Sequence, residues 1–262
     1  MEYNTLLFEH KDQLAHITLN RPEIGNALND VLTEELQRAM IECDENEDIR
    51  AVLLSGAGKV FSVGGDLTYF AEYAPVLSRE IKRFIVQLHG AIARMARMQA
   101  PVVAAVHGNI AGFGISLMAA SDITLAAESA TFTMAYTSVG LSPDGSSTYF
   151  LPRLVGMKRA LELTLTNRRL SAQEALEWGL VNQVVPDEQL IEDAQALTAK
   201  LAAGPTQAFG TAKRLLRASL ERTLETQMEY EAEGIAAMTK TEDFIEGVSA
   251  FLQKRPPEYK GK

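Results

Sequence analysis

The apolar positions in the first half of the chain predict strands and helices in alternation. Two β-like runs flank the polar stretch HKDQ within residues 5–20, a pattern typical of a hairpin. Apolar residues at helical spacing follow the Asn29–Asp30 pair, which suits a helix N-terminus. The apolar runs at 51–56 and 101–107 predict buried strands, and a helical pattern covers roughly 78–99 between them.

The middle of the chain continues this order. Residues 114–121 (GISLMAAS) have the composition of a buried helix, and residues 122–128 (DITLAAE) that of a strand. The pattern over residues 157–181 predicts helices that are interrupted near Ser171. Alternation of this kind is typical of an α/β core.

The last third is different, because its pattern is helical almost throughout. From about Asp187 onward the only clear interruptions are Gly204–Pro205 and Thr241. We therefore expect an α/β core over residues 1–195 and a helical C-terminal region over residues 196–262.

Composition and charge narrow the function classes. The 262 residues are 47% hydrophobic and 23% charged, which is ordinary for a globular protein. A formal net charge of −9 argues against a nucleic-acid surface, although a local basic patch for a phosphorylated ligand stays open. The single cysteine, Cys43, lies in an amphipathic helical pattern and is expected to be a buried thiol. No signal peptide or membrane-length apolar run is visible, so we expect a cytoplasmic protein without membrane contact.

Two glycine-rich segments carry the candidate chemistry. They are VLLSGAGKVFSVGGDL (52–67) and PVVAAVHGNIAGFG (101–114), and each begins as an apolar strand. Their spacing fits neither a phosphate-binding loop nor a dinucleotide fingerprint, and no histidine pair has metal-ligand spacing. Glycine lets a backbone approach a ligand closely, and the first N–H groups of a helix are free donors. Two such amides that converge would form an oxyanion hole, whereas ordinary loops are the alternative.

Four segments, taken in order, resemble the enoyl-CoA hydratase/isomerase (crotonase) family. The first is NRPEIGNALN (20–29), and the second is the first glycine-rich segment (52–67). The third is the second glycine-rich segment, extended to Phe132, and the fourth is ALEWGLVNQVV (175–185). The resemblance covers essentially the whole chain. It implies a spiral of ββα units with a helical C-terminal portion that serves oligomerisation, in a homotrimer or a dimer of trimers.

The resemblance also implies the chemistry. Members of the family bind an acyl-CoA thioester and hold its enolate oxygen with two backbone amides, which by motif are those of Val63 and Phe113 here. Many relatives have glycine where Phe113 stands. No metal and no separate cofactor is expected, because coenzyme A is part of the substrate.

The acid–base positions separate the branches of the family. Hydratases use two glutamates, and the matching residues here are Ser116 and Tyr136, so ordinary hydratase activity is not expected. The stretch GLSPDGSSTYFLPRLVG instead resembles the branch containing ring-1,2-epoxyphenylacetyl-CoA isomerase and Δ3,Δ2-enoyl-CoA isomerases, in which a single carboxylate, here Asp144, is the base. This implies an acyl-CoA isomerase acting on a fatty or aromatic acyl group. A Pro-Asp-Gly turn in which Asp144 only caps the next helix is the alternative.

Two other functions stay open. The chain is also similar to 4-chlorobenzoyl-CoA dehalogenase, in which an aspartate at the Asp144 position is the nucleophile and a histidine, here His89, is the base. Tyr136 stands where that branch has tryptophan, which weakens this reading but keeps Tyr136 as a possible catalytic residue. His89 could equally be a surface residue of its helix. A non-catalytic acyl-CoA-binding protein is the third possibility.

The coenzyme A contacts implied by the family cluster near the first glycine segment and at the C-terminus. Asp66 could instead cap a helix, Phe251 could lie in the core, and Lys254 could be a solvated charge. Tyr69, Phe70 and Tyr73 could line an acyl pocket or simply pack. The expected substrate- and CoA-binding residues are Ala27, Gly64, Gly65, Asp66, Leu67, Phe251 and Lys254.

Overall fold

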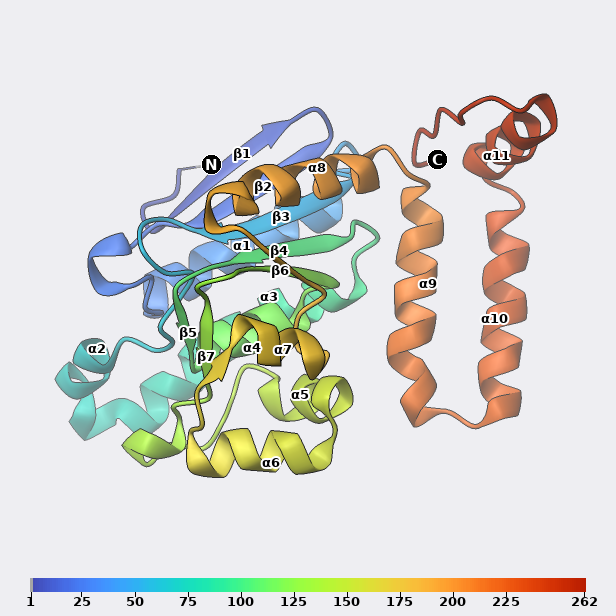
Figure 1. Ribbon diagram of the computed structural model, residues 1–262. Helices are drawn as coiled ribbons and strands as arrows, with labels where there is room; N and C mark the ends of the chain where they lie inside the picture. The colour runs from blue at the N-terminus through green and yellow to red at the C-terminus, as the bar shows by residue number, and fades with distance from the viewer. Residues whose placement is uncertain (1) are drawn as a thin grey trace.

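A twisted, mostly parallel sheet forms the centre of the molecule (Figure 1), in a computed structural model that describes residues 2–262. The predicted hairpin is confirmed, since β1 (Leu6–Lys11) pairs antiparallel with β2 (Leu14–Leu19). Every later pairing in this sheet is parallel, and the strand order is β1-β2-β3-β4-β6-β9. The remaining strands of this sheet are β3 (Ala51–Gly56), β4 (Val102–Val106), β6 (Ile123–Ala127) and β9 (Gln183–Val185).

Helices cover both faces of this sheet. Three of them, α1 (Asp30–Glu45), α3 (Leu77–Arg97) and α4 (Phe113–Ala120), each connect two neighbouring parallel strands. Right-handed crossovers that add strands in one direction place these helices on the same face. The opposite face is covered by α8 (Leu190–Ala202), which packs on β3 and β4 (Figure 1). Strands covered on both sides must be apolar throughout, which explains the uninterrupted runs in β3 and β4.

A second, smaller sheet completes the strand–strand–helix repeats. It consists of β5 (Asn109–Ala111), β7 (Thr131–Thr133) and β8 (Leu170–Ser171), in the order β5-β7-β8. The short strands β5 and β7 come directly after β4 and β6, so each repeat turns from the large sheet into the small one. This arrangement agrees with the ββα units that the family resemblance implies.

The other elements are short and surround the small sheet. The predicted interruption near Ser171 is confirmed by a capping box, in which Ser171 accepts from the Glu174 N–H. The short elements include the helices that follow Asp66 and Asp144, where the sequence offered a helix that each aspartate could cap. The short helices are α2 (Leu67–Glu72), α5 (Ser147–Val155), α6 (Met157–Thr166) and α7 (Ala172–Glu177). Single turns of 3-10 helix lie at Pro22–Ile24, Ala74–Val76, Thr137–Val139, Asp187–Gln189 and Ser219–Glu221.

The C-terminal helices stand beside the large sheet, and the first of them packs on α3 (Figure 1). They are α9 (Thr206–Ala218), α10 (Leu224–Met238) and α11 (Glu242–Gln253). The division expected at residue 195 falls inside α8, which packs on the sheet, so the separate helical unit begins at α9. Hydrophobic periodicity alone cannot distinguish a helix that covers a sheet from one that packs on other helices.

Two further expectations concern burial and membranes. Cys43 is buried as predicted, and burial raises the pKa of its thiol to about 12, so the thiol is unreactive at neutral pH. Within residues 2–262 we find no helix with the length and hydropathy of a membrane span.

Candidate active site

The two glycine-rich segments meet at one edge of the sheet. They follow β3 and β4, which are parallel neighbours, so their carboxyl ends lie together. The Ala111 N–H donates to the Ser62 carbonyl at 3.1 Å. A Cβ on Gly64, whose φ is +107°, would lie 3.1 Å from the Ala111 carbonyl oxygen and 3.4 Å from the Phe113 nitrogen. Only glycine allows the two backbones to approach this closely.

One amide at this junction is free because it begins a helix. Phe113 is the first residue of α4 and follows Gly112, whose φ of +49° turns the chain sharply into the helix. The N–H groups of the first helical turn have no acceptor within the helix. The Phe113 amide, predicted as an oxyanion donor, is therefore available, and it lies beside Gly64.

The first segment offers a different donor from the one expected. The Val63 N–H donates to the Gly25 carbonyl at 3.0 Å, so this amide is occupied. The Gly64 N–H is 3.2 Å from the Ser62 hydroxyl oxygen. Gly65 instead forms a parallel bridge to Leu28, and such a bridge leaves its own N–H pointing away.

The bonds that flank Gly65 confirm this orientation. The Leu28 N–H donates to the Gly64 carbonyl at 2.8 Å, and the Asp66 N–H donates to the Leu28 carbonyl at 2.9 Å. The Gly65 N–H has no acceptor within residues 2–262. The structure thus contradicts Val63 as a free donor and leaves Gly65 and Phe113 as the unoccupied pair. The sequence pattern could not choose among three adjacent amides, because their directions depend on the tertiary pairing with Leu28.

The carboxylate of Asp144 is held by a side chain and not by a helix end. The Tyr136 hydroxyl donates to Oδ1 of Asp144 at 2.7 Å. The N-terminal cap of α5 is Ser146, and the Ser147 N–H binds the Asp144 backbone carbonyl at 3.1 Å. The alternative that Asp144 caps this helix is therefore wrong. Gly145 packs on the Phe113 ring, because a Cβ there would lie 2.7 Å from Cδ2, so Asp144 is next to the second glycine turn.

Ser116 and Tyr136 form a polar chain behind this carboxylate. The Ser116 hydroxyl oxygen lies 3.0 Å from the Tyr136 hydroxyl oxygen and donates to the Asp144 carbonyl at 3.0 Å. Both side chains are buried. Ser116 and Tyr136, the positions where the family resemblance implies glutamates in hydratases, therefore bind the backbone carbonyl and the carboxylate of Asp144 respectively.

The surroundings make Asp144 a stronger base than an ordinary aspartate. Burial raises the pKa of its carboxyl group, and the Tyr136 hydrogen bond and the charge of His89 oppose that shift without cancelling it. Burial and the neighbouring carboxylate also raise the pKa of Tyr136, so its phenol stays protonated at neutral pH and continues to donate. Asp144 is consequently an ionisable group with one fixed donor and one free oxygen.

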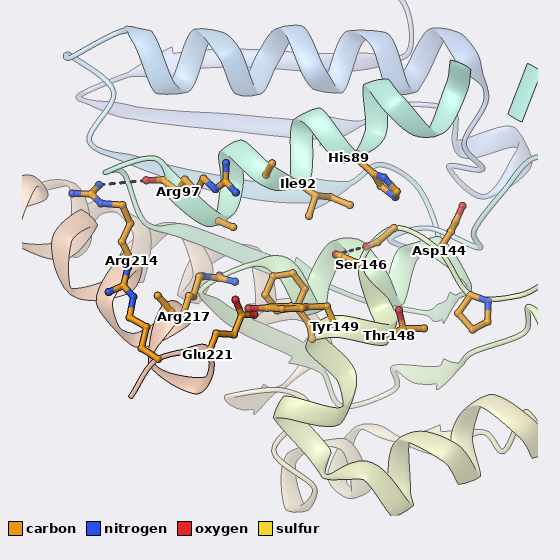
Figure 2. Close-up of a pocket in the computed structure, with 17 residues that line it drawn as sticks. His89, Ile92, Arg97, Asp144, Ser146, Thr148, Tyr149, Arg214, Arg217 and Glu221 are labelled. Carbon is orange, nitrogen blue, oxygen red and sulfur yellow. Dashed lines mark hydrogen bonds between the residues drawn. The ribbon is translucent and has the colours of Figure 1, made fainter. Parts of the chain in front are cut away.

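A cavity of about 850 Å³ opens beside Asp144. It lies between α3, α5 and α9, and His89 from α3 faces its Asp144 end (Figure 2). His89 is exposed, as expected if it were a surface residue of its helix, and it also lines the same cavity as Asp144. The structure thus brings together two of the predicted catalytic residues in one cavity.

The predicted coenzyme A residues fall into two groups. Gly64, Gly65 and Asp66 lie at the first glycine turn, beside the buried Ala27 and the exposed Leu67. The Asp66 carboxylate accepts from the Tyr69 N–H at 3.1 Å and pairs with Arg21 at 3.1 Å, so it does cap α2.

Phe251 and Lys254 lie on the C-terminal unit. The Phe251 side chain is 82% exposed, so the alternative that it belongs to the core is wrong. Lys254 is also exposed, at the end of α11.

The aromatic residues after the first glycine turn pack on one another. The rings of Tyr69 and Tyr73 are 4.7 Å apart, and Phe70 meets Phe84 edge-on at 5.9 Å. None of these residues lines the cavity beside Asp144. In the single chain these aromatic residues therefore pack on neighbouring rings, which was the alternative to lining an acyl pocket.

Comparison with known proteins agrees with this geometry. A sequence model described as Enoyl-CoA hydratase/isomerase matches residues 9–262. The chain is 40% identical to 1,2-epoxyphenylacetyl-CoA isomerase of Escherichia coli (strain K12), over 94% of both chains. It is 34% identical to 4-chlorobenzoyl coenzyme A dehalogenase-1 of Arthrobacter sp, over 94% of this chain and 90% of the relative.

A solved structure extends the agreement to the fold. The enoyl-CoA hydratase of Polaromonas sp. JS666 superposes with a TM-score of 0.93 at 32% identity, covering 97% of this chain and 99% of that one. The match includes the ββα spiral and the helical C-terminal portion, which confirms the predicted crotonase fold. The chain belongs to the enoyl-CoA hydratase/isomerase family.

Proposed function

We propose that this protein is an acyl-CoA isomerase in which Asp144 is the only acid–base carboxylate. The observation that carries the proposal is the state of Asp144: half-buried, bound by Tyr136, free of the helix cap and facing a cavity. Ser116 and Tyr136 cannot activate water as two glutamates do, because neither is a carboxylate. The 40% identical relative named as an isomerase supports the same reading.

The proposed reaction moves a double bond without adding atoms. The Asp144 carboxylate removes a proton from C2 of a 3-enoyl-CoA, and the electron pair shifts onto the thioester oxygen as an enolate. The amides of Gly65 and Phe113 stabilise that oxyanion. The protonated Asp144 then returns its proton at C4, which leaves the conjugated 2-enoyl-CoA. An epoxide could be rearranged through a similarly stabilised enolate.

A panel of thioesters tests the proposal. Purified protein is incubated with 3-enoyl-, 2-enoyl- and epoxyphenylacetyl-CoA in ordinary and deuterated water, and the products are followed by mass. We expect a product of unchanged mass in ordinary water. In heavy water we expect deuterium at C2 or C4 to the extent that the proton on Asp144 exchanges with solvent before it is returned. A product heavier by one water as the main result would show a hydratase and overturn the proposal.

A nucleophilic role for Asp144 is the second candidate. It is favoured by the placement of His89 at the same end of the cavity and by the 34% identical relative named as a dehalogenase. Asp144 would attack the ring carbon that bears the halogen, halide would leave, and water deprotonated by His89 would hydrolyse the aryl ester. Incubation with a halobenzoyl-CoA and detection of an aryl ester on Asp144 by mass spectrometry would establish this route.

We also propose a homo-oligomer, a trimer or a dimer of trimers. The C-terminal helices expose many large apolar side chains, which a single chain leaves in water. These residues include Leu224, Met228 and Ile235 on α10 and Ile245, Val248, Phe251 and Leu252 on α11. In the proposed assembly Phe251 and Lys254 meet the coenzyme A bound by a neighbouring subunit.

A further inference from the structure

The cavity beside Asp144 ends in a group of arginines. From His89 and Asp144 it continues between α3, α5 and α9, and the charged side chains at its far end are arginines together with Glu221 (Figure 2). This is notable because the chain as a whole carries a net charge of −9. The arginines that line the cavity are Arg97, Arg214, Arg217 and Arg222.

Most of this positive charge is not neutralised by the protein. Arg217 pairs with Asp122 at 2.9 Å, and the acidic lining residue Glu221 is paired with Arg153 at 3.4 Å. By contrast, neither Arg97 nor Arg214 forms an ion pair with any carboxylate of residues 2–262.

Two of the unpaired arginines, Arg214 and Arg222, make contacts with neutral groups, and Arg97 and Arg214 are exposed. Arg214 donates to the Arg97 carbonyl at 3.3 Å and to the Thr211 hydroxyl at 3.2 Å. Arg222, which also lacks a carboxylate partner in the described chain, lies 3.8 Å from the centre of the Tyr230 ring. Neutral contacts of this kind leave the guanidinium charge available to an anion.

Apolar side chains line part of the cavity between the two ends. They are Ile92, Ala93 and Ala96 of α3, Phe150 of α5 and Ala218 of α9. His89 and Arg97 are eight residues apart on one helix, which is about 12 Å at ~1.5 Å per residue. An extended hydrocarbon chain fits such a passage, with its reacting end at Asp144 and its other end at the arginines.

We propose that the acyl group accepted here carries a carboxylate at the end remote from the thioester. This inference rests on the proposed function, because it places the thioester end of the acyl chain at Asp144. The terminal carboxylate would receive charge-assisted hydrogen bonds from Arg97 and Arg214, while the methylene chain lies along the apolar wall. A plain fatty acyl chain of equal length would leave the same guanidinium groups without an anionic partner.

Binding of unreactive thioesters tests the proposal independently of catalysis. We would measure, by calorimetry, the affinities of the oligomeric wild-type protein for suberoyl-CoA and octanoyl-CoA, which have equal chain length and differ in the terminal carboxylate. Adipoyl- and sebacoyl-CoA with their monocarboxylic counterparts cover shorter and longer chains. We expect the best ω-carboxyl ligand to bind about 10- to 100-fold more tightly than its plain partner, the range for hydrogen bonds to a charged group.

Substitution of the arginines identifies the source of that preference. The double variant Arg97→Met/Arg214→Met keeps the apolar stems, and we expect the ratio of the two affinities to fall to near one. Arg94→Met is the matched control, because Arg94 lies in the same last turn of α3 but pairs with Asp44 outside the cavity. The control should keep the wild-type ratio.

The outcomes separate this inference from the isomerase proposal. No preference in the wild type, or an equal preference in the double variant, would overturn the carboxylate site even if 3-enoyl-CoA is isomerised. A parallel loss of affinity for free coenzyme A in the double variant would show that the arginines bind its phosphates, which also overturns it. A preserved preference without any isomerisation would support the carboxylate site and reject the proposed reaction.

Discussion

At the residue scale, Asp144 determines the chemistry through its surroundings. Its carboxylate is buried enough to have a raised pKa but keeps one free oxygen next to the cavity. The aspartate and its turn are visible in the sequence, but a Pro-Asp-Gly turn also suits a helix cap. The structure shows that the carboxylate instead accepts a hydrogen bond from the Tyr136 hydroxyl, eight residues away in the chain.

Asp144→Asn is expected to abolish the proposed isomerisation without unfolding the protein. Loss of a general base lowers the rate by about 10²- to 10⁴-fold. The amide oxygen can still accept from Tyr136, so the fold should persist. The measurement is turnover of a 3-enoyl-CoA accepted by the wild type; unchanged turnover would remove Asp144 from the mechanism.

The same variant has a predicted effect on stability. Because the folded-state pKa of Asp144 lies above its unfolded value, folding binds this proton more tightly. Its contribution is therefore fully favourable below the ordinary aspartate pKa and is lost as pH rises through the raised value. At neutral pH, Asp144→Asn should melt no lower than the wild type, as measured by thermal unfolding; a clearly lower melting temperature would contradict this reading of the pKa shift.

Tyr136→Phe should shift the acid limb of the pH–rate profile upward. The hydroxyl of Tyr136 stabilises the ionised carboxylate, so its removal raises the pKa of Asp144 further. The readout is the pH dependence of kcat/KM, which reports the free enzyme. Tyr259→Phe, in the C-terminal segment and outside the lining of this cavity, should leave the profile in place. A downward shift in Tyr136→Phe would show that the hydroxyl does not stabilise the carboxylate.

At the element scale, the glycine turns set the positions of the two free amides. Parallel pairing brings the ends of β3 and β4 together, and the contact between Gly64 and the Ala111–Phe113 turn then fixes the spacing of the donors. The strands and the turns were predicted from apolar runs and glycines. The donor in the first turn was not, since only the bridge between Leu28 and Gly65 decides which N–H is free.

Gly64→Ala should disrupt this arrangement. The new Cβ would meet the Ala111 carbonyl at 3.1 Å, and alanine disfavours a φ of +107°; strain of this kind costs about 1–3 kcal/mol. Gly156→Ala is the control for backbone strain, because its φ is +82° but its Cβ would meet nothing within 4 Å. Both variants should lose unfolding free energy, whereas only Gly64→Ala should lose about 10²-fold or more in kcat. Equal activities would show that the turn does not position a donor.

At the scale of the whole molecule, the C-terminal helices leave large apolar side chains exposed in the single chain. They stand beside the large sheet (Figure 1), with Phe251 exposed on α11. Their helical character was clear from the sequence. That α8 belongs with the sheet, and α9 begins the helices beside it, was known only from the packing of α8 on the sheet.

The double variant Phe251→Ser/Leu252→Ser is expected to weaken the assembly. Burial of two large apolar side chains is worth about 1.5–3 kcal/mol each, so loss of both should shift dissociation to much higher protein concentrations. Sedimentation velocity over a range of concentrations measures this. Glu225→Ser on exposed α10 controls for a general surface change. A wild-type protein that sediments as a monomer at all concentrations would contradict the proposed oligomer.

The sequence by itself determined the hairpin, the long buried strands, most of the helices and the two glycine turns, because these depend on local periodicity and residue chemistry. The absence of a glutamate pair and the candidacy of Asp144 followed from the resemblance of its motifs to the family. Tertiary structure decided which amides are free, that Asp144 faces a cavity rather than caps a helix, and that arginines from α3 and α9 gather at the far end of that cavity. Those features arise from contacts between residues distant in the chain, which neither spacing nor composition encodes.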